Sequence, residues 1–175
     1  VDVRREAGPD ENERICMHPS SNAPRRTLLL TGASRGIGHA TAIRFSSAGW
    51  RVITCSRHAF PEVCPWGAGP EDHIEVDLGD HDDTMRAISE IRERLENDEL
   101  HALVNNAAMQ IAKPLIETTV EEWDAVMAAN LRSVFLGVKL AHPLLKAGTG
   151  GAIVNVSSVH AIQTSANIAA YAASK

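Results

Sequence analysis

No run of apolar residues in the chain approaches the ~20 that a helix needs to cross a bilayer. The first residues also lack the apolar segment of a secretory signal. With 17 Lys and Arg against 22 Asp and Glu, the net charge is -5, so there is no basic surplus for nucleic acid. We therefore expect a cytoplasmic protein that binds neither membrane nor nucleic acid.

Cysteine is scarce as well. The 175 residues include three Cys, which cannot all pair with one another and share no zinc-like spacing with the eight His. We expect reduced thiols, as is usual in the cytosol, and no metal site. Cys55 lies in an apolar run and is predicted to be a small core residue.

The pattern of the chain changes near residue 26. Residues 1–25 are rich in charge, proline and serine, and we predict a mobile extension. Beyond them, apolar runs typical of strands alternate with segments of helical periodicity. Strands are predicted at 26–32, 51–56, 73–78, 101–108 and 151–158, and helices at 36–49, 82–97, 118–148 and from about 171. Near-continuous apolar strands are typical of a sheet covered on both faces, so residues 26–175 are predicted to form a doubly wound, Rossmann-like α/β domain.

Details of the predicted helices can be tested. The helix at 82–97 should bury Met85, Ile88, Ile91 and Leu95 on one side. The helix at 118–148 should begin at Thr118 or Thr119, with two Glu in its first turn, and end before Gly148. The segment 57–72 has three Pro and two Gly and is predicted to be a loop.

The segment "TGASRGIG" joins the first predicted strand to the first helix and places glycines at 32, 36 and 38. Glycine permits a tight turn and a close approach of a phosphate to the backbone, and the following helix N-terminus offers free N–H groups. A nucleotide-binding turn is favoured, although a simple strand-to-helix turn would also contain glycine.

The end of the second predicted strand indicates which nucleotide binds. An NAD site usually has an acidic residue there for the ribose, but this chain has Ser56 and Arg57. A carboxylate would repel a 2′-phosphate, whereas Ser and Arg would bind it, and Arg35 can reach the same region. The alternative is that both Arg are ordinary solvated charges. The sequence therefore predicts NADP(H) rather than NAD(H).

Six segments occur in a familiar order: "TGASRGIG", "VDL" at 76–78, "NNAA" at 105–108, "AAN" at 128–130, "IVNVSS" at 153–158 and "YAASK" at 171–175. In this order and spacing they resemble the short-chain dehydrogenase/reductase family, over residues 26–175. The resemblance implies an oxidoreductase that transfers a hydride between NADP(H) and a carbonyl or alcohol substrate, in a homo-oligomer.

The resemblance also assigns the site residues. Those implied to hold the cofactor are Gly32, Ser34, Arg35, Gly36, Ile37, Gly38, Asp77, Leu78, Asn105, Asn106 and Lys175, beside the Ser56 and Arg57 named above. Those implied to be catalytic are Asn130, Ser158, Tyr171 and Lys175, with Ser157 as the lesser candidate beside Ser158. Residues expected to line the substrate pocket are Gln110, His160 and Gln163, with His160 as a surface loop residue.

These residue types suit carbonyl reduction, which needs a proton donor at the substrate oxygen. Tyr171 can be that acid, and the ammonium of Lys175, one helical turn away, stabilises the phenolate. Ser158 would hold the oxygen as charge develops, and Asn130 would hold a water that resupplies protons. Run backwards, Tyr171 is the base for alcohol oxidation.

Members of the family continue well beyond the Tyr–Lys pair. We therefore expect a piece of a longer enzyme, with its sheet incomplete on the C-terminal side and the 175-residue chain itself inactive. A non-catalytic NADP(H)-binding or sensing module is the alternative, and a sugar-nucleotide epimerase, which usually has a TGxxGxxG turn, is disfavoured.

Overall fold

The computed structural model describes residues 25–61, 63–95, 99–147 and 150–175. The extension predicted over residues 1–25, apart from Arg25, and the helix end predicted at Gly148 lie outside the described residues. No helix in the described ranges is long and apolar enough to cross a membrane.

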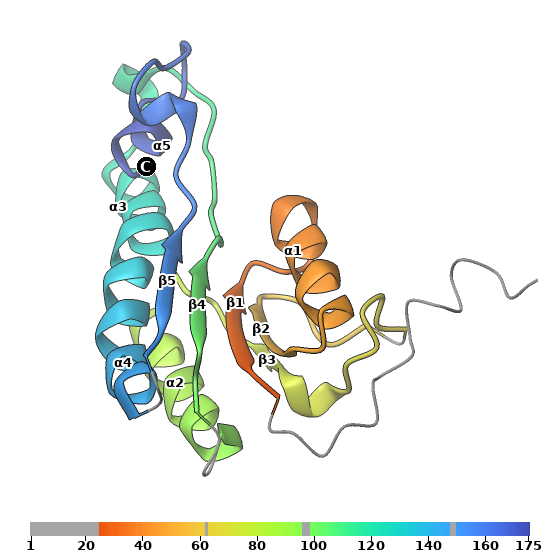
Figure 1. Ribbon diagram of the computed structural model, residues 1–175. Helices are drawn as coiled ribbons and strands as arrows, with labels where there is room; N and C mark the ends of the chain where they lie inside the picture. Colours follow the sequence, from red (N-terminus) through yellow and green to blue (C-terminus); the bar gives the residue numbers. More distant parts are fainter. Residues whose placement is uncertain (1–24, 62, 96–98, 148–149) are drawn as a thin grey trace, which may run out of the picture.

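A parallel sheet forms the centre of the domain (Figure 1). Its strands are β1 (Thr27–Thr31), β2 (Arg51–Ser56), β3 (His73–Glu75), β4 (Ala102–Asn105) and β5 (Ala152–Asn155), in the spatial order β3-β2-β1-β4-β5. Leu30 of β1 pairs with Thr54 on one side and with Val104 on the other. The order reverses between β1 and β4, where doubly wound sheets bind their ligands. The predicted fold class is confirmed.

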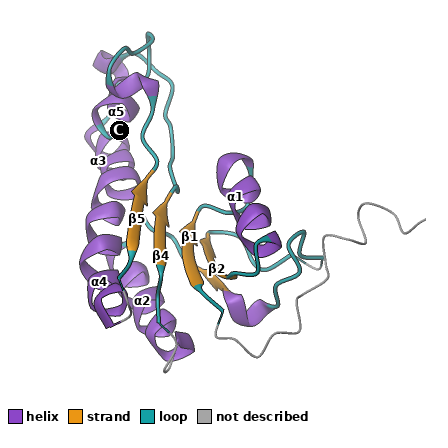
Figure 2. Ribbon diagram, viewed as in Figure 1, coloured by secondary structure: helices purple, strands orange, loops and turns teal. Residues whose placement is uncertain are grey.

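Helices cover both faces of the sheet (Figure 2). They are α1 (Gly36–Ser47), α2 (His81–Leu95), α3 (Val120–Met127), the π-helical turn η4 (Ala128–Arg132), α4 (Ser133–Ala147) and α5 (Ala169–Ala173). Helices α2, α3 and α4 lie on one side and α1 on the other (Figure 1). The side chains of β1 alternate accordingly: Leu29 packs with α2 and α4, while Leu28 and Leu30 pack with Ala42 of α1. Cys55 is buried, as predicted.

The structure confirms one of the helix predictions and corrects two. Thr119, not Thr118, caps α3: its Oγ1 accepts from the Glu122 N–H at 3.2 Å, and the Glu122 carboxylate accepts from the Thr119 N–H at 2.9 Å. The apolar side predicted for α2 was wrong in part, because Met85 is 39% exposed. The buried residues are Thr84, Ala87, Ile91 and Leu95. The buried side of α2 therefore differs from the predicted one by about one position and includes the small residue Ala87 in place of Met85. The single helix predicted over 118–148 is interrupted by η4.

The predicted strands exist but are shorter than the apolar runs that indicated them. β3 ends at Glu75 and β4 at Asn105, because the backbone after each leaves the sheet to form the turns at its C-terminal edge. In the described residues of the predicted loop at 57–72, the one helical element is the short 3-10 turn η2 (Pro70–Asp72). These departures put Asp77, Leu78, Asn106, Ser157 and Ser158 in loops beyond the strand ends.

Candidate active site

The glycine turn leaves the N-terminus of α1 open. Gly32 and Gly36 have φ angles of 71° and 59°, which favour glycine. Arg35 is the N-cap residue, but its side chain makes no cap hydrogen bond, and the first turn has no acidic residue. The first N–H groups of the helix and its positive dipole end can therefore receive an anion.

The turn also has no room for side chains at its centre. A Cβ added at Gly38 would lie 2.1 Å from the carbonyl oxygen of Gly32, closer than any Cβ can approach. A Cβ at Gly32 would lie 2.8 Å from the Cα of Ala107. The backbone of β1, α1 and the segment after β4 is therefore packed together at this point, which suits a pyrophosphate laid against bare backbone.

Two asparagines, the last residue of β4 and the residue after it, hold this arrangement. The Asn106 side chain donates to the carbonyls of Thr31 at 3.1 Å and Gly32 at 2.9 Å, and the Thr31 hydroxyl accepts from the N–H groups of Asn106 and Ala107, both at 3.0 Å. Asn105 is buried and donates to the side chain of Asn155 at 2.9 Å. Both amides are thus engaged inside the protein, and any contact with a cofactor falls to the exposed edges and backbone of this segment.

The residues predicted to surround the ribose and adenine lie at or beyond the ends of β2 and β3, apart from Arg35, which lies in the glycine turn. Arg35 and Arg57 are exposed, as are Ser34 and Ile37, which were predicted to hold the phosphates. The Ser56 hydroxyl donates to the His58 carbonyl at 3.1 Å and accepts from the His58 N–H at 3.3 Å. The Asp77 carboxylate accepts from the Gly79 N–H at 2.9 Å, and Leu78 packs against the core on the α2 side of the sheet. These side chains share the C-terminal edge of the sheet with the glycine turn.

Tyr171 lies in the middle of α5, and Lys175 lies two residues past the end of that helix. The Nζ of Lys175 is 5.9 Å from the centroid of the Tyr171 ring. The same Nζ donates to the carbonyl of Val156, which follows β5, at 2.7 Å. Burial lowers the pKa of Lys175, because a desolvated site disfavours the ammonium. The lysine is therefore held between the end of β5 and the phenol.

The two serines after β5 differ in their partners. The Ser157 hydroxyl donates to the backbone carbonyl of Lys175 at 2.7 Å, so it ties the two segments together. The Ser158 Oγ accepts from the His160 N–H at 3.2 Å and caps the 3-10 turn η5 (Val159–Ala161). Among the described residues the Ser158 hydroxyl proton has no acceptor, so it can be donated to a substrate oxygen.

Asn130 lies in η4 and is 2% exposed. Its Oδ1 accepts from the Met109 N–H at 2.8 Å, and its Nδ2 donates to the Met109 carbonyl at 2.8 Å and to the Ser174 hydroxyl at 2.9 Å. The π turn rotates this amide inward, where it joins the segment after β4 to α5. The side chain is thus used within the protein, and a bound water would have to be held by other atoms.

One residue near the phenol was misjudged from sequence. His160 was expected on the surface, but it is half-buried, with its ring centroid 6.1 Å from that of Tyr171 in an edge-to-face arrangement. Its Nδ1 is buried and has no hydrogen-bond partner among the described residues. Only its position two residues after Ser158 could have indicated this contact.

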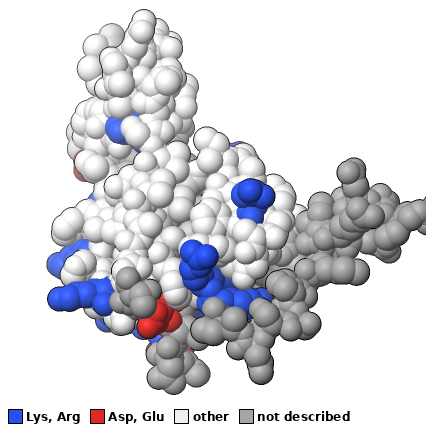
Figure 3. All heavy atoms as spheres, viewed as in Figure 1, with Lys and Arg blue, Asp and Glu red and all other residues white. Residues whose placement is uncertain are grey.

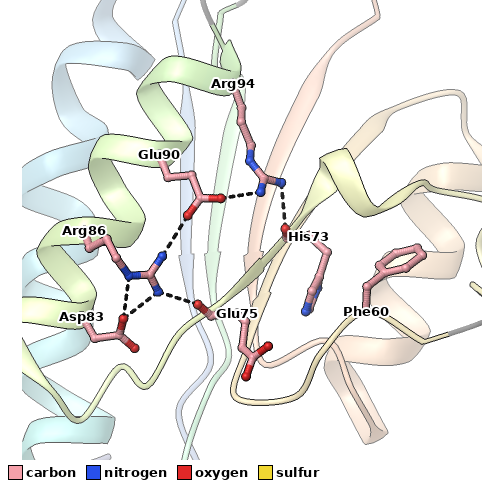
Figure 4. Close-up of a pocket in the computed structure, with 7 residues that line it drawn as sticks. All are labelled: Phe60, His73, Glu75, Asp83, Arg86, Glu90 and Arg94. Atoms are coloured by element: carbon pink, nitrogen blue, oxygen red, sulfur yellow. Dashed lines mark hydrogen bonds and ion pairs between the residues drawn. The ribbon is translucent and has the colours of Figure 1, made fainter.

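A separate hollow of about 520 Å³ lies at the β3 edge, between that strand and α2 (Figure 4). It is lined by Phe60, His73, Glu75, Asp83, Arg86, Glu90 and Arg94. None of these belongs to the predicted site, so this hollow is separate from the residues predicted to be catalytic.

Comparisons with known proteins agree with this geometry. The sequence model of the short chain dehydrogenase family matches residues 26–175, and the chain belongs to that family. It is 48% identical to Protein FixR of Bradyrhizobium diazoefficiens over 141 residues, which are 77% of this chain and 50% of that protein. It is 36% identical to Carbonyl reductase [NADPH] 2 of Sus scrofa over 153 residues, which are 84% of this chain and 59% of that protein.

The fold matches a solved structure. An oxidoreductase of the short chain dehydrogenase/reductase family from Brucella ovis, in complex with a partially ordered NAD, superposes with a TM-score of 0.81 and 49% identity. The match covers 86% of this chain and 71% of that chain. The chain spans about half the length of the curated relatives it matches, 50% and 59% for the two named above.

Proposed function

We propose that this chain is the cofactor-binding and proton-transfer part of an NADP(H)-dependent oxidoreductase that interconverts a carbonyl and an alcohol. The observation that carries this proposal is the Tyr171–Lys175 pair, with Nζ 5.9 Å from the ring centroid. The backbone carbonyl of Lys175 accepts a hydrogen bond from the Ser157 hydroxyl. The next residue, Ser158, has a hydroxyl proton without an acceptor among the described residues. The open N-terminus of α1 supports a dinucleotide at the same edge of the sheet.

In the proposed reaction, the reduced nicotinamide, when bound, supplies the hydride to the carbonyl carbon. Tyr171 donates its phenolic proton to the carbonyl oxygen, and the Ser158 hydroxyl donates a hydrogen bond to the same oxygen as negative charge develops there. The ammonium of Lys175 stabilises the phenolate that remains. In the reverse direction the Tyr171 phenolate accepts the proton of the alcohol.

The preference for NADP(H) over NAD(H) is part of the proposal. One relative is named for NADPH and one solved structure holds NAD, so family membership does not decide it. Its support is local: β2 ends in Ser56 followed by Arg57, without an acid. Arg57 is exposed and has no side-chain partner within the described part of the chain, so its guanidinium is free for a 2′-phosphate.

The test is an Arg57→Ala substitution in the complete protein that carries this chain. Loss of one charge-assisted contact should weaken NADPH binding by roughly tenfold to a hundredfold and leave NADH binding nearly unchanged. Arg44→Ala, an exposed arginine in the last turn of α1, is the control and should change neither. Equal weakening of both cofactors by Arg57→Ala would refute the assignment.

A cytoplasmic location and a homo-oligomer are also part of the proposal. Cys55 and Cys64 are free thiols, which suits the cytoplasm. Leu131 and Phe135 are 53% and 59% exposed on η4 and α4, which suits a homo-oligomer. The second candidate function, binding or sensing of NADP(H) without turnover, is favoured for the 175-residue chain alone, because all four residues of β5 beside the catalytic segment are exposed. NADPH oxidation with a panel of carbonyl compounds distinguishes the two.

A further inference from the structure

The loop that follows β2 carries the residues proposed to recognise a 2′-phosphate, and its first turn rests on a side chain from another strand. His73 is the first residue of β3. Its Nε2 lies 2.8 Å from the carbonyl oxygen of His58, and its Nδ1 lies 2.8 Å from the hydroxyl of Thr54 in β2. A carbonyl can only accept, so Nε2 carries the proton and donates to His58.

Further hydrogen bonds link His58 to Ser56, one of the residues proposed to bind the cofactor. The same His58 carbonyl accepts from the Ser56 hydroxyl at 3.1 Å, and the His58 N–H donates back to that hydroxyl at 3.3 Å. Ser56 and His58 are thus fixed to each other, with Arg57 between them. Ser56 is the last residue of β2, and its carbonyl accepts from the Val76 N–H at 2.8 Å, so the sheet fixes the start of this three-residue turn. His73 fixes its other end, at His58.

The loop has little else to hold it near Arg57. The described residues of 57–69, all but residue 62, form no helix or strand, so no ladder of backbone hydrogen bonds defines their path. The far end of the loop is held through Trp66, whose carbonyl accepts from the Ser46 hydroxyl at 2.8 Å and whose ring packs edge-on to His39 at 5.6 Å. That anchor lies eight or more residues beyond the turn and cannot set its conformation.

We propose that His73 is a positioning residue for cofactor choice: its Nε2–H bond to the His58 carbonyl fixes the end of the turn, and so holds Arg57 and the Ser56 hydroxyl where a 2′-phosphate binds. This inference rests on the NADP(H) preference proposed above. Only NADPH carries the 2′-phosphate, whereas the open turn at α1 and the Tyr–Lys pair serve both cofactors. Loss of the His73 bond therefore weakens NADPH selectively.

The experiment uses the complete protein and compares its dissociation constants for NADPH and NADH, with thermal unfolding recorded for every variant. His73→Phe keeps a ring but removes both nitrogens, and His73→Gln keeps an N–H donor that reaches the His58 carbonyl. Phe60→Leu is the matched control, because it removes the ring that lies 5.8 Å from the His73 ring and leaves the hydrogen bond intact (Figure 4).

We expect His73→Phe to lower the preference for NADPH over NADH roughly twofold to tenfold, as loss of one neutral hydrogen bond predicts. His73→Gln should restore most of it, and Phe60→Leu should keep the wild-type ratio even if it lowers the melting temperature. Should His73→Phe fail to fold, His73→Asn, whose shorter amide does not reach His58, replaces it with the same expectation.

The outcomes separate the two claims. The wild-type ratio tests the proposed function, and a protein without preference for NADPH contradicts both that function and this inference. With a wild-type preference in place, an unchanged ratio in His73→Phe, or an equal loss for both cofactors, overturns the role of His73 alone. So does a Phe60→Leu variant that loses as much of the preference as His73→Phe.

Discussion

The two edge strands of the sheet, β3 and β5, differ in how far other parts of the chain cover them. At the β3 edge, the outward carbonyls of His73 and Glu75 accept hydrogen bonds from Arg94 and Arg86 of α2, each at 2.7 Å (Figure 4). At the β5 edge, all four residues are exposed, including Ile153 at 39% and Val154 at 50%. Figure 3 shows that the surface on this side of the molecule is mostly uncharged, with a small patch of Lys or Arg in its upper part. One edge is closed by the chain's own side chains, and the other is open.

This difference separates the two halves of the proposed site. The glycine turn and the Ser56–Arg57 turn lie beside strands that are buried on both faces. Tyr171 and Lys175 depend on the end of β5, through the bond from Lys175 to Val156. An exposed edge strand with apolar side chains is a template for association with another chain. The cofactor half should therefore be the more self-sufficient, and the catalytic half should depend on whatever covers β5.

The largest expected effect comes from leaving that edge open. Expressed alone, residues 1–175 should aggregate or remain partly ordered, bind the adenine half of NADP(H) weakly, and show no carbonyl reduction. Sedimentation and NADPH oxidation, compared with the complete protein, measure this. Val154→Lys, which places a charge on the open edge, should reduce self-association. A monodisperse, active 175-residue chain would show that β5 needs no cover.

A smaller effect is expected at the closed edge. Arg94 donates to the carbonyls of Pro70, Glu71 and His73 and is paired with Glu90. Arg94→Ala leaves these acceptors without their partner and should lower the free energy of unfolding by about 1–2 kcal/mol in urea denaturation. Arg92→Ala removes an exposed arginine from the same helix and should cost almost nothing. Equal effects would mean that the edge is not closed by Arg94.

The smallest effect concerns acid stability at the same edge. The N–H of Asp77, donating to Asp83 at 2.7 Å, and then Arg86 hold the pKa of the Asp83 carboxyl below its usual value. Its contribution to stability is therefore present above the ordinary carboxyl pKa and is lost as the pH falls through the lowered one. Asp83→Asn should reduce the melting temperature by about 1–2 °C at neutral pH and leave it nearly unchanged once the pH lies below the lowered pKa.

Asp82→Asn is the control for that measurement, since the Asp82 side chain is exposed on the same turn and makes no hydrogen bond within the described ranges. A decrease that persists in strong acid would point to packing rather than charge as the role of Asp83.

Much of the fold could be predicted because its signals are local. Five apolar runs, the glycine turn and the stop at Gly49, whose φ is 82°, follow from residue type at consecutive positions. The buried side of α2 could not be predicted fully, because a tight approach to the sheet favours Ala87 and Thr84 over the larger Met85. Periodicity predicts that a helix has a buried side, but it does not fix to within one position which residues lie on that side.

In the candidate site, too, some features could be predicted from the sequence and others could not. Tyr171, Lys175 and the serines could be placed from their spacing and the family resemblance. The partners of Asn130 could not, because Met109 and Ser174 are 21 and 44 residues away along the chain and meet it only through the π turn. The contacts of His73 with Thr54 and His58 likewise depend on strand register. Such contacts have no sequence signal until the fold is known.

The central claim is that Tyr171 transfers the proton and Lys175 supports it while the cofactor is held elsewhere. Tyr171→Phe in the complete protein tests this most directly, since it removes only the hydroxyl. We predict that kcat for carbonyl reduction falls by about 10²–10⁴-fold while the Kd for NADPH stays nearly unchanged, and that Lys175→Met impairs both. A Tyr171→Phe enzyme that keeps near-wild-type kcat would contradict the account.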